Sequence, residues 1–250
     1  MKFGLVVHRL HRFGPESGLL RWARTCETGL RALAMGLHAT GGAHDTLASK
    51  SLLGDLLVAV GNGRDGGLMR LVSRMAGGLS PQDALDGVFF LVDPVDPTSV
   101  YPEAQALKRQ CVIHGKPFVG TATGAIEWVA VELANAGLHT LIPPDARALF
   151  DLKSQTVALI AHDALKNHMV DYASNHFDLL SRFAARVATG TTGSRLNDMA
   201  WARGWPQDTP WVTRYQSGPL GGDAQIAELV LDRRRSEERR VGKECYALCR

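Results

Sequence analysis

The stretch Thr156-Val-Ala-Leu-Ile-Ala-His-Asp163 decides the fold, because a short apolar run rich in branched side chains ends in two polar residues. An apolar run of this length, with no alternation of polar side chains, is typical of a strand buried on both faces of a parallel sheet. The segment 164–183 then carries apolar residues at helical spacing, and Arg186–Ala188 begins the next apolar run. Strand, helix and strand in this order predict a β-α-β unit, so the fold class is α/β.

The same alternation continues along the chain in both directions. Downstream it predicts a helix over 194–202, an extended segment over 211–215 and a helix over 222–234. Upstream it predicts a complete unit with strands at 3–7, 36–39, 56–60, 88–92 and 116–120, a helix ending at residue 75 and a closing helix over 146–152.

We therefore predict two tandem, three-layer, parallel-sheet domains, a complete one over 1–152 and an incomplete one over 153–234. The second domain would lack its last two strands. A parallel sheet without them exposes an apolar edge, which favours truncation of this domain.

The last segment, 235–250, departs from this pattern. Its charged sequence Arg235-Ser-Glu-Glu-Arg-Arg-Val-Gly-Lys-Glu-Cys245 has no apolar periodicity and resembles a translated sequencing adapter. We predict a non-native tail and exclude it from the fold; the alternative is a solvated charged helix. Most of the small excess of positive charge, formally +3, lies in this tail.

The composition excludes several classes of protein. With 45% hydrophobic and 21% charged residues the chain is ordinary globular material. No apolar run approaches the roughly 18 residues that a membrane span needs, and the N-terminus does not resemble a signal peptide. Basic residues are scattered with few aromatics among them, which argues against nucleic acid as a partner. Four cysteines without zinc spacing favour a reduced, cytoplasmic protein.

Two loops that follow predicted strands are suited to binding phosphate. The first is Thr189-Gly190-Thr191-Thr192, which offers backbone N–H groups, hydroxyls and the positive end of a helix dipole. The second contributes Ser217 and Gly218, and Lys166 supplies a point charge. Alone, the first loop is equally explained by a threonine N-cap with a tight glycine turn.

A single carboxylate follows the second loop. Asp223 comes directly after two glycines, so its backbone can approach a ligand closely, and we predict that it is a general base. The alternative is a helix cap or a partner of the helix dipole. His162 is predicted to hydrogen-bond or orient the substrate, unless it is a histidine satisfied at a strand end. Asp163 is predicted to orient its neighbours.

On these residues the chain resembles the methylglyoxal synthase family over 155–234. The matching pieces are Ala161-His-Asp163 with Lys166, Ala188-Thr-Gly-Thr-Thr-Gly193, and Ser217-Gly-Pro-Leu-Gly-Gly-Asp223 with Gln225. The resemblance implies a lyase that converts dihydroxyacetone phosphate, a small phosphate ester, to methylglyoxal and phosphate through an enediolate. It also implies a homo-oligomer with no metal or organic cofactor.

The chain departs from the family in a way that affects activity. The family's substrate-contacting histidine follows the fourth strand, which the second domain lacks, and Val100 stands at that place in the first domain. We therefore expect an inactive fragment of a synthase. In the first domain Arg12 replaces the lysine and Gly42-Ala43 replaces two threonines.

Two alternatives concern the first domain. It resembles regulatory domains of the same fold in carbamoyl phosphate synthetase, which bind effectors without chemistry. Its Gly61-Asn-Gly-Arg-Asp-Gly66 also spells a dinucleotide fingerprint, but it follows the third strand and has no acidic residue at the expected distance. We instead align this loop with Ser217–Asp223, pairing Asp65 with Asp223.

Overall fold

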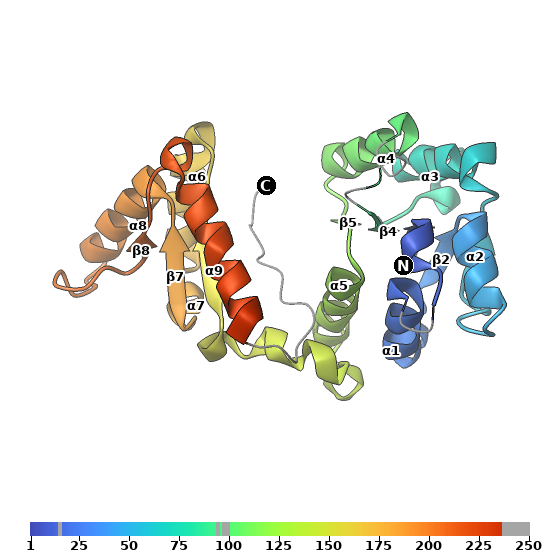
Figure 1. Ribbon diagram of the computed structural model, residues 1–250, viewed down its shortest axis with the longest axis horizontal. Coiled ribbons are helices and arrows are strands. Elements are labelled where there is room, and N and C mark those ends of the chain that lie inside the picture. Colours follow the sequence, from blue (N-terminus) through green and yellow to red (C-terminus); the bar gives the residue numbers. More distant parts are fainter. Residues whose placement is uncertain (15–16, 94–95, 97–100, 237–250) are drawn as a thin grey trace. The chain divides into compact units, whose positions relative to one another are not determined.

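A computed structural model describes residues 1–14, 17–93, 96 and 101–236 of the chain. The chain divides between Arg147 and Ala148 into two compact units, which we call the N-terminal unit and the C-terminal unit (Figure 1). The division falls a few residues before the predicted boundary at residue 152. Of the predicted tail over 235–250, residues 237–250 lie outside the described residues.

The N-terminal unit contains a parallel sheet in which the first strand is central. In its described part the strand order is β3-β2-β1-β4-β5, with β1 at Lys2–Val7, β2 at Gly36–Ala39, β3 at Leu57–Ala59, β4 at Gly87–Leu91 and β5 at Phe118–Val119. Leu5 pairs with Ala39 on one side and with Phe89 on the other. All strands of the sheet run parallel, as predicted.

Helices cover both faces of this sheet. Leu5 and Phe89 point into the larger core, while Val6 and Val88 point into the smaller one. The larger core includes α1 (Gly18–Ala32), α2 (Gly41–Ala48) and α5 (Ala122–Asn135), and the smaller includes α3 (Gly67–Met75) and α4 (Pro102–Ile113). Burial on both faces explains why the strands are continuous apolar runs. The predicted three-layer α/β architecture is confirmed here.

The C-terminal unit has the same layering around a smaller sheet. The strands are β6 (Thr156–Leu159), β7 (Ala185–Ala188) and β8 (Thr213–Arg214), all parallel and in the order β6-β7-β8. One face carries α6 (Lys166–Asn175), α7 (Phe177–Ser181) and α8 (Gly190–Ala202), and the other carries α9 (Gly222–Ser236). Within the described residues, β6 pairs on one side only, whereas β1 pairs on both.

Short 3-10 turns follow the strands that matter for the site. They are η1 (Arg9–His11), η2 (Gly63–Asp65), η8 (Asp163–Leu165) and η9 (Gly218–Leu220). Each reverses the chain at the carboxyl end of a strand, where parallel sheets bind ligands.

The prediction for the end of the N-terminal unit was wrong in one respect. The segment predicted as a closing helix over 146–152 forms 3-10 turns at Pro144–Phe150 and Leu152–Ser154. The segment joins α5 to β6, and 3-10 turns are frequent in such connectors. The helix that packs after the fifth strand is α5.

No helix in the described part of the chain is both long enough and apolar enough to cross a lipid bilayer.

Candidate phosphate-binding site

The first predicted phosphate loop lies between β7 and α8. Thr189 occupies the N-cap position of α8 with extended backbone angles (φ −77°, ψ 148°), but its side chain makes no capping hydrogen bond. The N–H of Gly190 donates to the carbonyl oxygen of Gln216 at 2.9 Å, which joins this loop to the one after β8. Because the threonine does not cap the helix, the amides of its first turn can serve another acceptor.

The second loop is shaped by its two glycines. Gly221 has a φ of 93°, which lies in the left-handed region that favours glycine. The N–H of Gly222 donates to the carbonyl oxygen of Ser217 at 3.0 Å. A β-carbon on Gly222 would lie 1.8 Å from the carbonyl oxygen of Gln216, so a larger residue does not fit. This packing sets the start of α9 directly against the loop.

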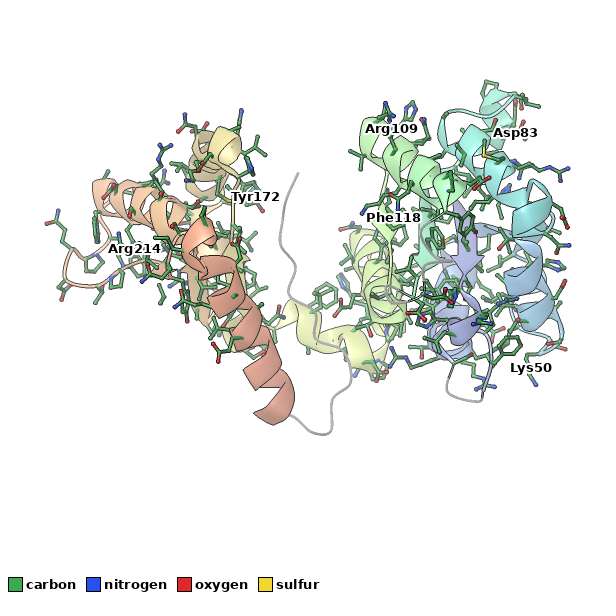
Figure 2. All side chains as sticks on the ribbon, turned by 45° about the horizontal axis from the view of Figure 1, so that its top comes forward. Lys50, Asp83, Arg109, Phe118, Tyr172 and Arg214 are labelled. Atoms are coloured by element: carbon green, nitrogen blue, oxygen red, sulfur yellow. The ribbon has the colours of Figure 1, made fainter. Side chains whose placement is uncertain are left out.

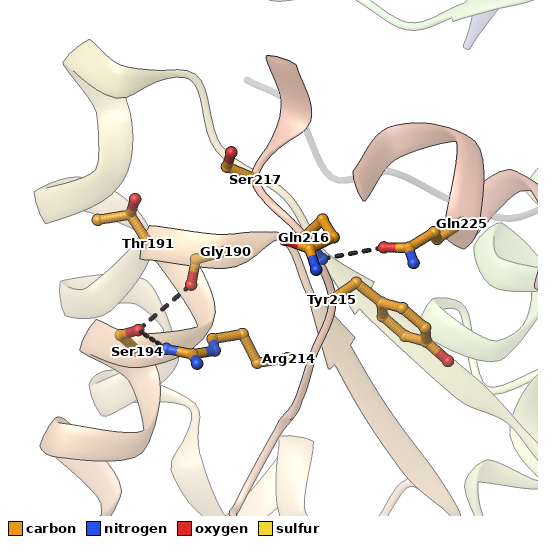
Figure 3. Close-up of a pocket in the computed structure, with 8 residues that line it drawn as sticks. All are labelled: Gly190, Thr191, Ser194, Arg214, Tyr215, Gln216, Ser217 and Gln225. Atoms are coloured by element: carbon orange, nitrogen blue, oxygen red, sulfur yellow. Dashed lines mark hydrogen bonds between the residues drawn. The ribbon is translucent and has the colours of Figure 1, made fainter. Parts of the chain in front are cut away.

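A cavity of about 430 Å³ opens between the two loops (Figure 3). Its wall combines backbone of the α8 start with side chains of β8, of the loop after it and of α9: Gly190, Thr191, Ser194, Arg214, Tyr215, Gln216, Ser217 and Gln225. Three predicted residues, Gly190, Thr191 and Ser217, therefore lie together. Its volume is in the range of small-molecule sites.

Arg214 is a cation in this wall that the sequence interpretation missed. Its Nη1 donates to Ser194 Oγ at 2.7 Å, and that hydroxyl donates to the carbonyl oxygen of Gly190 at 3.4 Å. The guanidinium is thereby held at the first turn of α8. A signal was present, since Arg214 comes three residues before Ser217, on the strand that leads into the predicted loop.

Lys166 is held by a neighbour instead of reaching the cavity. Its ammonium is ion-paired with Asp163 Oδ1, with the lysine side chain 15% exposed and the aspartate 86% exposed. The hydrogen bond from Lys166, and then its charge, hold the pKa of the Asp163 carboxyl below its usual value. His162 occupies the N-cap position of η8 and is exposed. None of the three lines the cavity.

The predicted base lies beside the second loop. Asp223 is exposed in the first turn of α9, and a β-carbon on Gly218 would lie 3.0 Å from its Oδ2. Asp223 is thus packed against the backbone of a predicted phosphate-binding residue. Two positions further along α9, Gln225 Oε1 accepts from the N–H of Gln216 at 3.0 Å, which fixes the helix to the loop.

Thr192 differs from Thr191 because it belongs to the core, and Thr189 is buried as well. The Thr192 side chain is fully buried, and its Oγ1 has no hydrogen-bond partner among the described residues. Thr192 does not line the cavity. Of these two neighbouring threonines, Thr191 and Thr192, the exposed Thr191 is the one that lines it.

The N-terminal unit contains a loop of the same geometry. The N–H of Gly41 donates to the carbonyl oxygen of Gly61 at 2.9 Å, and the N–H of Gly67 donates to that of Asn62 at 2.9 Å. Gly66 has a φ of 86° and ends η2, as Gly221 ends η9. Asn62 and Gly66 therefore correspond to Ser217 and Gly221.

This correspondence corrects the predicted alignment of two aspartates. Asp65 precedes the left-handed glycine and corresponds to Leu220, because both residues end a 3-10 turn. The residue at the place of Asp223 is Leu68, which is fully buried. The N-terminal unit has the loop geometry without the carboxylate.

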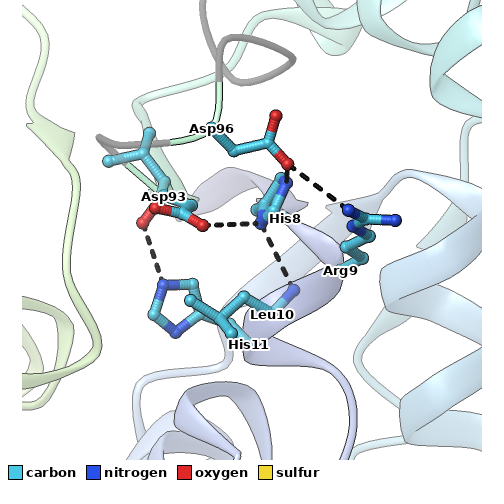
Figure 4. A network of polar contacts seen from close by, with 7 residues as sticks. His8, Arg9, Leu10, His11, Asp93 and Asp96 are labelled. Carbon is cyan, nitrogen blue, oxygen red and sulfur yellow. Dashed lines mark hydrogen bonds and ion pairs between the residues drawn. The ribbon is translucent and has the colours of Figure 1, made fainter.

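A polar cluster at the ends of β1 and β4 was also missed by the sequence interpretation (Figure 4). His8 Nε2 lies 3.0 Å from Asp96 Oδ2, and His8 Nδ1 lies 3.9 Å from Asp93 Oδ2. The three side chains offer possible metal ligands within 4.8 Å of one another. However, the carboxylates approach different ring nitrogens, and Nδ1 also accepts from the N–H of Leu10 at 3.3 Å. The two carboxylates therefore hold the imidazole of His8 from both of its ring nitrogens. Val100 lies outside the described residues.

Curated enzymes of one kind match this chain over about half of their own length. The chain is 49% identical over 77 residues to methylglyoxal synthase of Rhizobium etli, covering 31% of this chain and 55% of the relative. It is 45% identical over 78 residues to methylglyoxal synthase of Thermus thermophilus, with the same shares. No model of a protein family matches the chain.

Among solved structures, the crystal structure of methylglyoxal synthase from Elizabethkingia anophelis NUHP1 is 33% identical, with a TM-score of 0.28, and covers 32% of this chain and 47% of that one. The chain spans about half the length of the curated relatives it matches. It therefore contains a domain similar to methylglyoxal synthase over roughly a third of its length.

Proposed function

We propose that the C-terminal unit binds a phosphate ester, and that in an intact protein it belongs to a lyase that converts dihydroxyacetone phosphate to methylglyoxal and phosphate. The observation that carries this proposal is the position of Asp223, whose Oδ2 lies against Gly218 at the edge of the loop that lines the cavity. A carboxylate beside a phosphate loop is the arrangement that proton abstraction next to a carbonyl requires.

The residues would divide the chemistry among them. The amides of the α8 start, the hydroxyls of Thr189, Thr191 and Ser217, and the Arg214 guanidinium would bind the phosphate. Asp223 would remove a proton from the hydroxymethyl carbon, leaving an enediolate. The carbon–oxygen bond to phosphate then breaks, the phosphate leaves with the bonding electrons, and the enol tautomerises to methylglyoxal.

Lys166 and His162 are assigned supporting roles in this proposal. Lys166 would leave Asp163 and add its charge to the phosphate, and His162 would orient the carbonyl end of the substrate. Thr192 is assigned to the packing of the loop. We further propose that the two units are tandem copies, with an incomplete second copy, in a cytoplasmic homo-oligomer.

Elimination is not expected from this chain, because its C-terminal unit has no described counterpart of β4 and the residue after it. Proton abstraction is the step to measure. Dihydroxyacetone phosphate in D₂O should exchange its hydroxymethyl protons for deuterium in the presence of the chain, as followed by proton NMR.

The control pair separates the base from general surface charge. Asp223→Asn should abolish the exchange while preserving phosphate binding. Asp198→Asn, which removes an exposed carboxylate from α8, should leave both unchanged. Equal exchange by the chain and by Asp223→Asn would rule out Asp223 as the base.

A second candidate function concerns the N-terminal unit. Leu68 at the place of Asp223 favours a non-catalytic binding module over a second active site. Such a module would bind ligand without turnover, in the way that regulatory domains do.

A further inference from the structure

A second cavity lies in the N-terminal unit, between the segment after η1 and the helices α1 and α2. Its volume is about 500 Å³, within the range of small-molecule sites. The described residues that line it include three cations and no carboxylate: Arg12, Phe13, Gly14, Leu20, Arg24, Thr46, Ser49 and Lys50. Lys50, labelled in Figure 2, lies two residues after the end of α2.

The guanidinium of Arg12 packs against Gly42 in the first turn of α2. A β-carbon on Gly42 would lie 1.9 Å from its Nη1, so the glycine leaves the space that the guanidinium fills. Arg12 also lies over the ring of Phe13, 5.4 Å from the ring centroid. Its Nε is buried and has no hydrogen-bond partner among the described residues. Because Nε is covered by protein atoms, a ligand in the cavity would not contact it, and the charge of Arg12 is what the cavity offers.

Apart from the three cations, the wall is uncharged and combines hydroxyl oxygens with apolar surface. Thr46 Oγ1 donates to the carbonyl oxygen of Gly42 at 2.7 Å, and Ser49 Oγ donates to that of Thr46 at 2.9 Å. Because both protons are taken by the helix, the hydroxyl oxygens are left to accept. Leu20 is buried and Phe13 is 70% exposed, so the wall also offers apolar surface.

We propose that this cavity binds a small phosphomonoester with a ring-bearing apolar body, its phosphate at Arg12 and Lys50 and its ring along Phe13. Cationic side chains of both kinds suit a dianionic oxyanion. The cavity lies in the N-terminal unit, so its test is independent of the function proposed for the C-terminal unit.

The experiment is a calorimetric titration of the full chain with phenyl phosphate, and separately with inorganic phosphate. Phenyl phosphate should bind more tightly than inorganic phosphate. Lys50→Gln should weaken phenyl phosphate binding at least tenfold. Its matched control is Lys108→Gln, which removes an exposed lysine from α4, among the helices on the other face of the sheet, and should leave binding unchanged.

Two further variants locate the ligand. Phe13→Leu should weaken phenyl phosphate binding and leave inorganic phosphate binding unaffected. Arg214→Gln, in the C-terminal unit, should leave intact the phenyl phosphate binding that Lys50→Gln weakens. Equal effects of Lys50→Gln and Lys108→Gln would overturn the proposal. So would phenyl phosphate binding that is lost only in Arg214→Gln, since the ligand would then occupy the other cavity.

Discussion

A β-carbon on Gly190 would lie 2.8 Å from both the backbone nitrogen and the α-carbon of Ser217. The two loops of the C-terminal cavity are therefore packed backbone to backbone. We predict that Gly190→Ala pushes them apart, costs about 1–3 kcal/mol of unfolding free energy through overpacking, and weakens inorganic phosphate binding by about tenfold or more through lost N–H contacts.

Chemical denaturation and calorimetry measure these two effects. The matched control is Gly54→Ala, where the added β-carbon would meet nothing within 4 Å. If Gly190→Ala behaves like Gly54→Ala, the loops are not in the contact described.

Arg214 is predicted to contribute to phosphate affinity and little to stability. Removing the charge in Arg214→Gln should weaken inorganic phosphate binding by about tenfold, because a hydrogen bond to a charged group is worth about 1.5–3 kcal/mol. Arg203→Gln is the control, since Arg203 Nη1 also donates to a serine hydroxyl, Ser174 Oγ at 3.0 Å, away from the cavity. Calorimetry on both variants should show a loss for Arg214→Gln alone.

The ion pair of Lys166 with Asp163 predicts a gain of affinity by mutation. Asp163→Asn should release the ammonium and strengthen phosphate binding several-fold, with the melting temperature almost unchanged because the carboxylate is exposed. An unchanged or lower affinity would show that Lys166 does not reach the ligand.

The same pair predicts a pH effect with a definite sign. The pKa of Asp163 is lowered in the folded chain, so the pair's contribution to stability is present above the carboxyl's unfolded value and lost as pH falls through the lowered one. Below that point Lys166 is released without mutation. The unmodified chain should bind phosphate more weakly than Asp163→Asn at neutral pH, and this difference in affinity should shrink on acidification. Titrations with phosphate at a series of pH values measure it.

Cys26 is predicted to be inert in the native N-terminal unit. Burial, and then the charge of Asp145, raise the pKa of its thiol to about 12. Above the unfolded thiol pKa the unfolded chain ionises and the folded chain does not, so stability should fall by about 1.4 kcal/mol per pH unit from this group until the folded thiol ionises. Mass spectrometry after alkylation should find Cys26 labelled only in denaturant; rapid labelling of the native chain would contradict its burial.

The strands could be predicted because their burial on both faces leaves a direct trace in the sequence. Residues 157–159 and 88–91 are apolar throughout, and both stretches lie in parallel strands as predicted. The helix Ala122–Asn135 was overlooked because it is apolar over much of its surface, which hides helical periodicity. Its identity depends on packing against α1, a contact between distant parts of the sequence.

The candidate site was predictable in type but not in detail. Glycines and hydroxyl residues at strand ends marked the loops that surround the cavity, and Ser217 and Thr191 lie there. Which hydroxyl is open was not predictable, because Thr192 turns into the core by the rotation of α8. The sequence alignment of the two loops also paired Asp65 wrongly with Asp223. The correct alignment superposes the left-handed glycines, Gly66 and Gly221, and pairs Asp65 with Leu220.

The matching torsions of Gly66 and Gly221 have a practical consequence for protein engineering. Main-chain hydrogen bonds shape both loops, so the loop geometry does not depend on the side chain two positions after the left-handed glycine. The described part of the chain thus carries this loop twice, followed once by the charged Asp223 and once by the apolar Leu68. Because Asp223 is exposed and Leu68 is fully buried, exchanging the two side chains would bury a carboxylate in the N-terminal core and expose a leucine on the C-terminal unit.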